Sequence, residues 1–137
     1  MLQFYFLSVL LNALTGFVLL FVDRDDPDAV IEGKMPAIMQ DETFRLVLGI
    51  LTCITGFFKL LSAVRGDIPV IGDLIPAFAG LIGGFTLLYD FYKQRSTVDE
   101  DSLPPVVKKI IGARKYVGIG CLLAAILHFL FPTVLFL

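Results

Sequence analysis

The chain has 137 residues, of which 57% are hydrophobic, and its formal net charge is −2. The length allows one domain. Ordinary soluble domains are about 45–50% apolar, so the composition is not that of a typical soluble domain. The charge balance also argues against nucleic-acid binding, which requires clustered basic charge.

Four long apolar stretches follow one another along the chain, and most charged residues lie between them. A membrane-spanning helix needs about 20 mostly apolar residues. The first stretch has no positively charged start and no cleavage site of small residues before Asp23, so we interpret it as a retained span and not as a signal peptide. The sequence predicts an all-α fold: an integral membrane bundle of four transmembrane helices, forming a single domain over residues 1–137. The expected spans are residues 3–22, 44–64, 72–92 and 116–137.

The basic residues predict the orientation of these spans. Nine Lys and Arg lie in or beside the loops at 23–43 and 93–115, whereas only Lys59 and Arg65 lie toward the opposite side. Loops rich in Lys and Arg stay on the cytoplasmic side of a membrane. We therefore expect both loops to be cytoplasmic and both termini to lie on the non-cytoplasmic side of the cell membrane.

The two expected cytoplasmic loops differ in character. The loop at 23–43 is acidic and contains Pro27 and Pro36, so we expect it to be irregular, and we expect no metal site from its carboxylates. In the other loop a double proline precedes "VVKKIIGARK", whose apolar residues recur at helical spacing. This pattern predicts a short interfacial helix, or alternatively the first turn of the fourth span. The residues expected to face lipid headgroups are Lys108, Lys109, Arg114 and Lys115.

Each span carries one face of small or polar residues and one face of Leu, Ile, Val and Phe. The tripeptide Thr-Gly-Phe occurs at residues 15–17 and again at 55–57. Between membrane helices, small residues permit close backbone approach and dominate the contacts. We therefore expect the small faces to pack together and the aromatic residues either to face lipid or to act as wedges between helices. The expected packing residues are Gly16, Gly56, Gly80, Gly84 and Gly118.

Four polar residues lie near the middle of their spans, and they form the candidate binding site. Ionisable and polar groups inside a span are costly, which makes each a functional hypothesis. Meeting at one depth, they would bind a small solute, an ion or a proton. Alternatively, they form hydrogen bonds between helices and have a structural role. These residues are Asn12, Thr52, Thr55 and His128.

Two further charged residues lie at opposite ends of their spans. Lys59 lies toward the outer end of the second span, and we expect it to reach Asp73 or to extend outward to the membrane surface. Asp90 lies at the inner end of the third span, and we expect it to meet Arg114 or Lys115.

The stretch "RKYVGIGCLLAAILHFLF" resembles part of the ferric-reductase-like transmembrane domain family. In that family a basic pair precedes a Leu-Gly step, and a haem-binding His follows about ten residues later. Arg114, Lys115, Gly118 and His128 match this spacing over some 15 residues. The family's further histidines on neighbouring helices are missing, because His128 is the only histidine of the chain. The resemblance therefore implies a haem between two histidines only if a second subunit supplies one.

No motif of a hydrolase, a zinc peptidase or a nucleotide-binding loop occurs in the chain. We therefore expect no enzymatic activity and no cofactor. The leading functional hypothesis is a small non-enzymatic subunit, or an accessory or assembly component, of a larger membrane complex. The alternatives are a homo-oligomeric transporter or channel, and a redox subunit that binds haem or quinone through His128. The expected partners are the lipid bilayer and either other membrane subunits or further copies of the chain, associating through the small-residue faces.

Overall fold

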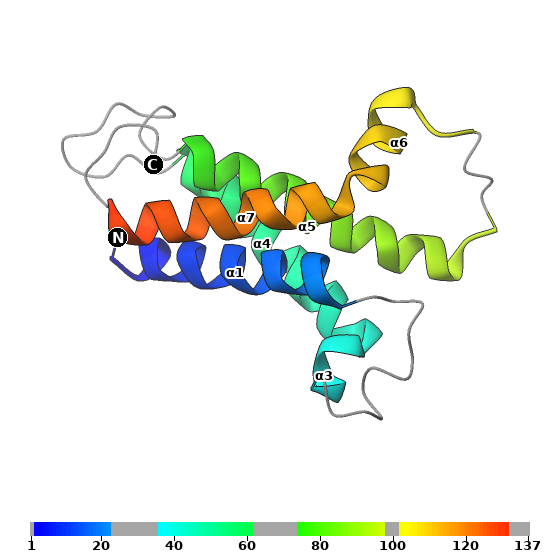
Figure 1. Cartoon of the computed structure of the whole chain (residues 1–137), viewed down its shortest axis with the longest axis horizontal. Helices are drawn as coiled ribbons and strands as arrows, with labels where there is room; N and C mark the ends of the chain where they lie inside the picture. The colour runs from blue at the N-terminus through cyan, green and yellow to red at the C-terminus, as the bar shows by residue number, and fades with distance from the viewer. Residues whose placement is uncertain (1, 23–35, 62–73, 98–101, 132–137) are drawn as a thin grey trace.

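In a computed structural model, residues 2–22, 36–61, 74–97 and 102–131 are described, and nearly all of them are helical, with no strand among them. Four long helices form a bundle (Figure 1), and two short helices, α3 and α6, leave it at one end. Three of the long helices are long and apolar enough to cross a membrane, and a fourth span is added if α6 and α7 are counted as one bent pair. The helices are α1 (Leu2–Phe21), α3 (Ala37–Gln40), α4 (Glu42–Leu61), α5 (Leu74–Arg95), α6 (Pro105–Gly112) and α7 (Arg114–Leu130).

Local sequence explains where several of these helices begin and end. Asp41 separates α3 from α4, and its Oδ1 accepts a hydrogen bond of 2.8 Å from the backbone N–H of Phe44, which satisfies one free donor of the first turn. The carboxylate of Glu42 and the basic residues Lys93 and Arg95 complement the helix dipole at the start of α4 and at the end of α5. Pro105 occupies the first position of α6, where a missing N–H costs nothing.

The observed helices differ from the expected spans in three places. Residues 37–43, expected to be irregular, contain α3 and the start of α4, because the cap at Asp41 begins the helix early. Helix α5 continues to Arg95, three residues past the expected end at 92. Helix α7 begins at Arg114, and α6 is a separate helix bent by 71° from it. The short helix expected around residues 106–111 is therefore present as α6, and the alternative, that it forms the first turn of the fourth span, holds only if α6 and α7 are counted as one bent pair.

The bundle is built from two antiparallel pairs. Helix α1 packs along α7, and α4 packs along α5, with α5 also in contact with α1 and α7 (Figure 1). The apolar part of the interior lies mainly on α1 and just after it, where Val18, Leu19 and Val22 are almost fully buried, together with Leu48 and Leu87.

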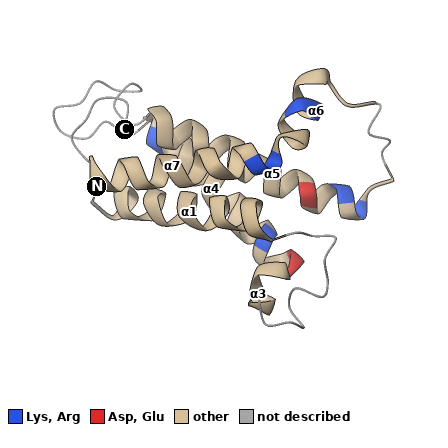
Figure 2. Ribbon diagram, in the orientation of Figure 1, with Lys and Arg blue, Asp and Glu red and all other residues tan. Residues whose placement is uncertain are grey.

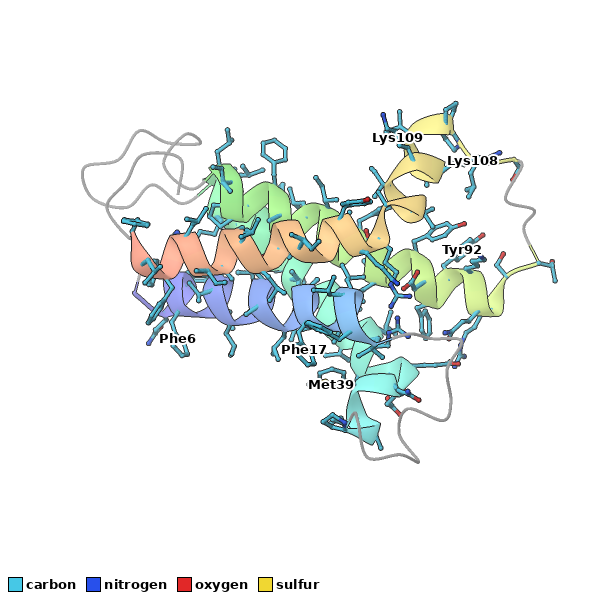
Figure 3. The ribbon with its side chains drawn as sticks, viewed as in Figure 1. Phe6, Phe17, Met39, Tyr92, Lys108 and Lys109 are labelled. Carbon is cyan, nitrogen blue, oxygen red and sulfur yellow. The ribbon has the colours of Figure 1, made fainter. Side chains whose placement is uncertain are left out.

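The outer surface of the four long helices is apolar. Phe57 on α4 is 53% exposed, Phe85 on α5 is 42% exposed, and Phe6 on α1 is 61% exposed. Figure 3 shows Phe6 pointing away from the bundle. By contrast, ten of the described residues are polar or charged and buried in the interior: Ser8, Asn12, Thr15, Arg45, Thr52, Thr55, Lys59, Thr86, Asp90 and His128. Polarity is thus inverted relative to a soluble protein, whose large apolar side chains are mostly buried.

Candidate functional site

One face of α4 carries the polar groups that organise the interior. Arg45, Thr52, Thr55 and Lys59 are all at most 5% exposed. Their spacing of seven, three and four residues places them on one side of a helix with 3.6 residues per turn. From the first to the last they span about 21 Å at 1.5 Å per residue. Arg45, Thr52 and Lys59 lie at three levels along this face, and each contacts residues of other helices.

At the end of the bundle where α6 leaves, Asp90 of α5 lies between two arginines. Its Oδ2 is 3.1 Å from Nη2 of Arg45 and 3.6 Å from Nη1 of Arg114. Arg114 also donates from Nη2 to the backbone carbonyl of Val22, at 3.0 Å. These three charged side chains, hereafter the charged cluster, join α4, α5 and α7 to the last turn of α1. The predicted contact of Asp90 with Arg114 is present, and the closer contact with Arg45 was missed.

In the middle of the bundle, hydroxyl and amide groups are hydrogen-bonded between helices. The hydroxyls of Thr15 and Thr52 lie 2.9 Å apart, and Thr52 also donates to the carbonyl of Leu48 at 2.6 Å. Thr15 is therefore the donor between α1 and α4, because a hydroxyl has only one proton to give. Asn12 donates from Nδ2 to the carbonyl of Pro76 at 3.0 Å. We call these groups the middle polar layer.

At the opposite end, Lys59 of α4 meets His128 of α7. Nζ of Lys59 lies 3.1 Å from Nε2 of His128, and the two side chains belong to residues that are 3% and 1% exposed. Tyr5 of α1 donates its hydroxyl proton to the carbonyl of His128 at 2.6 Å, and its ring centroid is 4.5 Å from that of the imidazole. With a protonated Lys59 as donor, Nε2 must be the acceptor and His128 must carry its proton on Nδ1. We call Tyr5, Lys59 and His128 the lysine–histidine cluster.

The predicted glycines bring backbones together within each helix pair. A Cβ at Gly16 would lie 2.7 Å from the carbonyl oxygen of Gly118, and one at Gly118 would lie 3.0 Å from that of Gly16. A Cβ at Gly84 would lie 2.7 Å from the carbonyl oxygen of Gly49. These positions therefore require the absence of a side chain, which permits the close contact of α1 with α7 and of α4 with α5.

The other two predicted packing glycines, Gly56 and Gly80, also lie between α4 and α5. A Cβ at Gly56 would lie 2.8 Å from the carbonyl oxygen of Ala77, whereas one at Gly80 would be 3.3 Å from both Oδ1 of Asn12 and the carbonyl oxygen of Thr52. Gly80 is therefore less constrained than Gly84. Sequence reasoning did not select Gly83, where a Cβ would lie 2.6 Å from Sγ of Cys121.

The four residues proposed as one midplane site do not meet. Asn12 and Thr52 belong to the middle polar layer, and Thr55 is buried beside it on α4. His128 contacts Lys59, which lies seven residues beyond Thr52 and therefore about 10 Å farther along α4. The prediction placed His128 by its depth in the expected span 116–137, but the described part of α7 ends at Leu130, so His128 lies in its last turn.

Lys59 does not extend outward as one alternative held, because its side chain is buried against His128. The other alternative, a contact with Asp73, concerns a residue outside the described part of the chain. Sequence reasoning could have found both Lys59 and Arg45, since each continues the small and polar face of α4 at helical spacing. Nothing in the sequence pointed to Tyr5.

The residues predicted to face lipid headgroups divide into two groups. Lys108, Lys109 and Lys115 are exposed, and Figure 3 shows Lys108 and Lys109 on α6, pointing away from the bundle. Arg114 is instead turned inward to Asp90 and Val22. Most Lys and Arg of the described residues gather at the end where α3 and α6 lie (Figure 2), whereas Lys59 lies beside His128 toward the other end.

The haem implied by the local resemblance does not fit His128. Its Nε2 is engaged by Lys59 at 3.1 Å, and the residue is 1% exposed among packed helices. Within the described ranges, no three His, Cys, Asp or Glu residues are placed to share a metal ion. Cys53 and Cys121 are free, and Sγ of Cys121 lies 3.2 Å from the carbonyl of Ala79.

Comparison with known proteins gives a family but no assigned activity. The profile of a family of unknown function matches residues 1–128. A protein of Treponema pallidum (strain Nichols), described as an uncharacterized protein, is 37% identical over 137 residues, which cover 100% of this chain and 100% of that protein. No solved structure matches the chain. The similarity to the Treponema pallidum protein extends over all the helices described here.

Proposed function

The chain belongs to the same family as the Treponema pallidum protein. We propose that it is a four-span integral membrane protein acting as a non-enzymatic subunit of a larger membrane complex. The inverted polarity of the bundle carries the first part of this proposal. Monomeric soluble proteins rarely expose large contiguous apolar patches, whereas exposed Phe, Leu and Ile occur along all four long helices. Lipid is the environment in which such a surface is stable.

In this proposal α7 forms the fourth span and α6 lies outside it. Helix α7 has 17 residues in its described part, which is at the short end of the range for a membrane-spanning helix. Helix α6 leaves it at 71° and carries exposed Lys108 and Lys109 beside its apolar residues. This arrangement supports α7 as the span and α6 as a helix lying in the headgroup region.

The distribution of charge supports the proposed orientation. The end with α3, α6 and the charged cluster carries most of the described basic residues (Figure 2). By the positive-inside rule this end faces the cytoplasm. The lysine–histidine cluster, with the start of α1 and the end of α7, then lies toward the non-cytoplasmic side of the cell membrane, which is where we place both termini.

The packing of the interior supports a subunit over a pore formed by one copy. Gly16, Gly49, Gly84 and Gly118 hold backbones in contact, and several of the polar groups between the helices are hydrogen-bonded to one another. The small-residue faces are therefore used inside the bundle. Partner helices would pack on the apolar outer faces, including the region of Gly120, where a Cβ would have nothing within 4 Å.

One observation favours a homo-oligomeric transporter or channel as the second candidate. Buried polar groups occur at three heights along α4, from Arg45 to Lys59, and charged residues within spans mark ion and proton pathways in many membrane proteins. In this candidate a second copy must complete the pathway, because the described interior of one copy is filled by close helix contacts.

The composition of the native complex tests the proposal. The protein is tagged at its C-terminus in its own cells, membranes are washed with alkaline carbonate, and the protein is extracted in mild detergent. We expect it to stay in the washed membranes and to purify with fixed partner proteins that are absent from an untagged strain. Release by carbonate would contradict the membrane assignment. Purification as a monomer would contradict the subunit, and a homo-oligomer without other proteins would support the transporter.

A further inference from the structure

A hollow of about 450 Å³ lies between the last turn of α1 and the bend from α6 to α7. This volume is within the range of about 300–1,000 Å³ that is usual for small-molecule sites. The α1 side contributes apolar residues, and the bend contributes cationic and hydroxyl groups. The lining residues used below are Phe21, Gly112, Arg114, Lys115 and Tyr116.

The two walls of this hollow have different chemistry. Phe21 is 52% exposed and Tyr116 is 77% exposed, so a ligand can reach the hollow from outside the bundle. Lys115 is exposed, and no ion pair joins it to a carboxylate of the part of the chain that the structure describes. A ligand that fits both walls has an anionic group next to an apolar chain.

The end of α1 would by itself disfavour an anion, because the last carbonyls of a helix carry partial negative charge. Arg114 offsets this effect by donating from Nη2 to the carbonyl of Val22 at 3.0 Å. The same side chain contacts Asp90 at 3.6 Å, which fixes the bend against α1 and α5. Arg114 therefore positions the hollow, and Lys115 and Tyr116 provide the groups that are available to a ligand.

We propose that this hollow binds the headgroup of an anionic phospholipid, with the phosphate at Lys115 and the Tyr116 hydroxyl and the acyl chain along Phe21. The proposal rests on the membrane location proposed above, because α6 then lies at the depth of the headgroups. An anionic phospholipid matches both walls, whereas free phosphate matches only the cationic one.

The test uses the full chain purified in detergent and reconstituted with phosphatidylglycerol or phosphatidylcholine, with retained lipid measured by native mass spectrometry. We expect the protein to retain phosphatidylglycerol preferentially. Lys115→Gln should weaken this retention about five-fold, which corresponds to the contribution of one basic residue near an anionic surface. Lys93→Gln removes an exposed lysine of α5 at the same end but outside the hollow, and it should retain the lipid as wild type does.

A second variant fills the hollow without changing its charge. A Cβ at Gly112 would have nothing within 4 Å, so Gly112→Leu should fold normally and yet lose the preference for phosphatidylglycerol. Equal retention of both lipids by wild type would overturn the site, as would an equal loss in Lys93→Gln and Lys115→Gln. Inorganic phosphate that displaces phosphatidylglycerol at millimolar concentration would show a free-phosphate site and would also overturn the lipid proposal. A protein that resists carbonate but shows no lipid preference contradicts this site alone and not the membrane location.

Discussion

Gly84→Ala is the substitution whose effect the contact between α4 and α5 defines most sharply. The added Cβ would lie 2.7 Å from the carbonyl oxygen of Gly49, 2.7 Å from Sγ of Cys53 and 2.9 Å from the backbone nitrogen of Cys53. Two of these three atoms belong to the backbone of α4, so rotation of a side chain cannot relieve the contact. The two helices must separate by a few tenths of an ångström or more, along the pair with the most extensive contact among the described helices.

The expected destabilisation has two opposing contributions. Overpacking a close contact typically costs about 1–3 kcal/mol, whereas replacing Gly by Ala within a helix contributes up to about 1 kcal/mol in helix propensity. The net loss in free energy of unfolding should therefore be on the order of 1–2 kcal/mol. Gly84→Leu adds three further carbons at the same place and should prevent assembly of the bundle.

Gly120→Ala is the matched control. Gly120 also lies within a long helix, but a Cβ there would have nothing within 4 Å, so this variant gains helix propensity without a clash. Thermal unfolding in one detergent, followed by circular dichroism, should give a lower midpoint for Gly84→Ala and an unchanged or higher midpoint for Gly120→Ala. If both variants unfold at the same temperature, close backbone contact at Gly84 does not hold α4 against α5.

Three further changes probe the two polar ends and the orientation. Asp90→Asn should lower the free energy of unfolding by about 3–5 kcal/mol, because it leaves the buried guanidinium of Arg45 and the half-buried one of Arg114 without their carboxylate. The exposed pair of Glu42 with Arg95, 3.5 Å apart, makes Glu42→Gln the control, with a loss below about 1 kcal/mol. His128→Gln should unfold close to wild type because Gln can still accept a hydrogen bond from Lys59, whereas His128→Leu should be strongly destabilised in the same thermal assay. If His128→Gln assembles normally but abolishes the activity of the complex, His128 is functional and not only structural. A reporter active only in the cytoplasm should be active when fused after Asp99 and silent at the C-terminus, and the reverse pattern would contradict the orientation.

Much of the helix arrangement could be predicted, because one-dimensional periodicity determines which face of a helix is buried. Asn12, Thr15 and Gly16 recur at helical spacing and are all buried in α1. In both Thr-Gly-Phe tripeptides the Thr and Gly are buried, but the aromatic residues differ: Phe57 is 53% exposed, whereas Phe17 is half-buried.

The pairing of polar groups between helices could not be predicted in the same way. The axial offset between two neighbouring helices depends on the loops and on the glycine contacts. Sliding one helix by one turn, about 5.4 Å, would pair each polar side chain with a different residue of the neighbouring helix. Asp90 was therefore expected to meet only the basic residues of α7, although Arg45 is closer. Helix α7 ends at Leu130, short of the expected end at 137, which places His128 in its last turn, and His128 pairs there with Lys59 instead of Thr52.

The contact of the outer helix faces with lipid is the central claim, and tryptophan fluorescence tests it directly because the chain contains no Trp. Phe85→Trp places a single Trp in the middle of α5, where the side chain is 42% exposed, and Tyr92→Trp places one near the end of the same helix, where it is 53% exposed (Figure 3 shows Tyr92). In reconstituted vesicles, lipids brominated deep in the acyl chain should strongly quench the fluorescence of the Phe85→Trp variant, and aqueous iodide should not. The Tyr92→Trp variant should be quenched more by iodide than the Phe85→Trp variant is. Strong quenching of the Phe85→Trp variant by iodide, with no effect of brominated lipid, would contradict the membrane assignment.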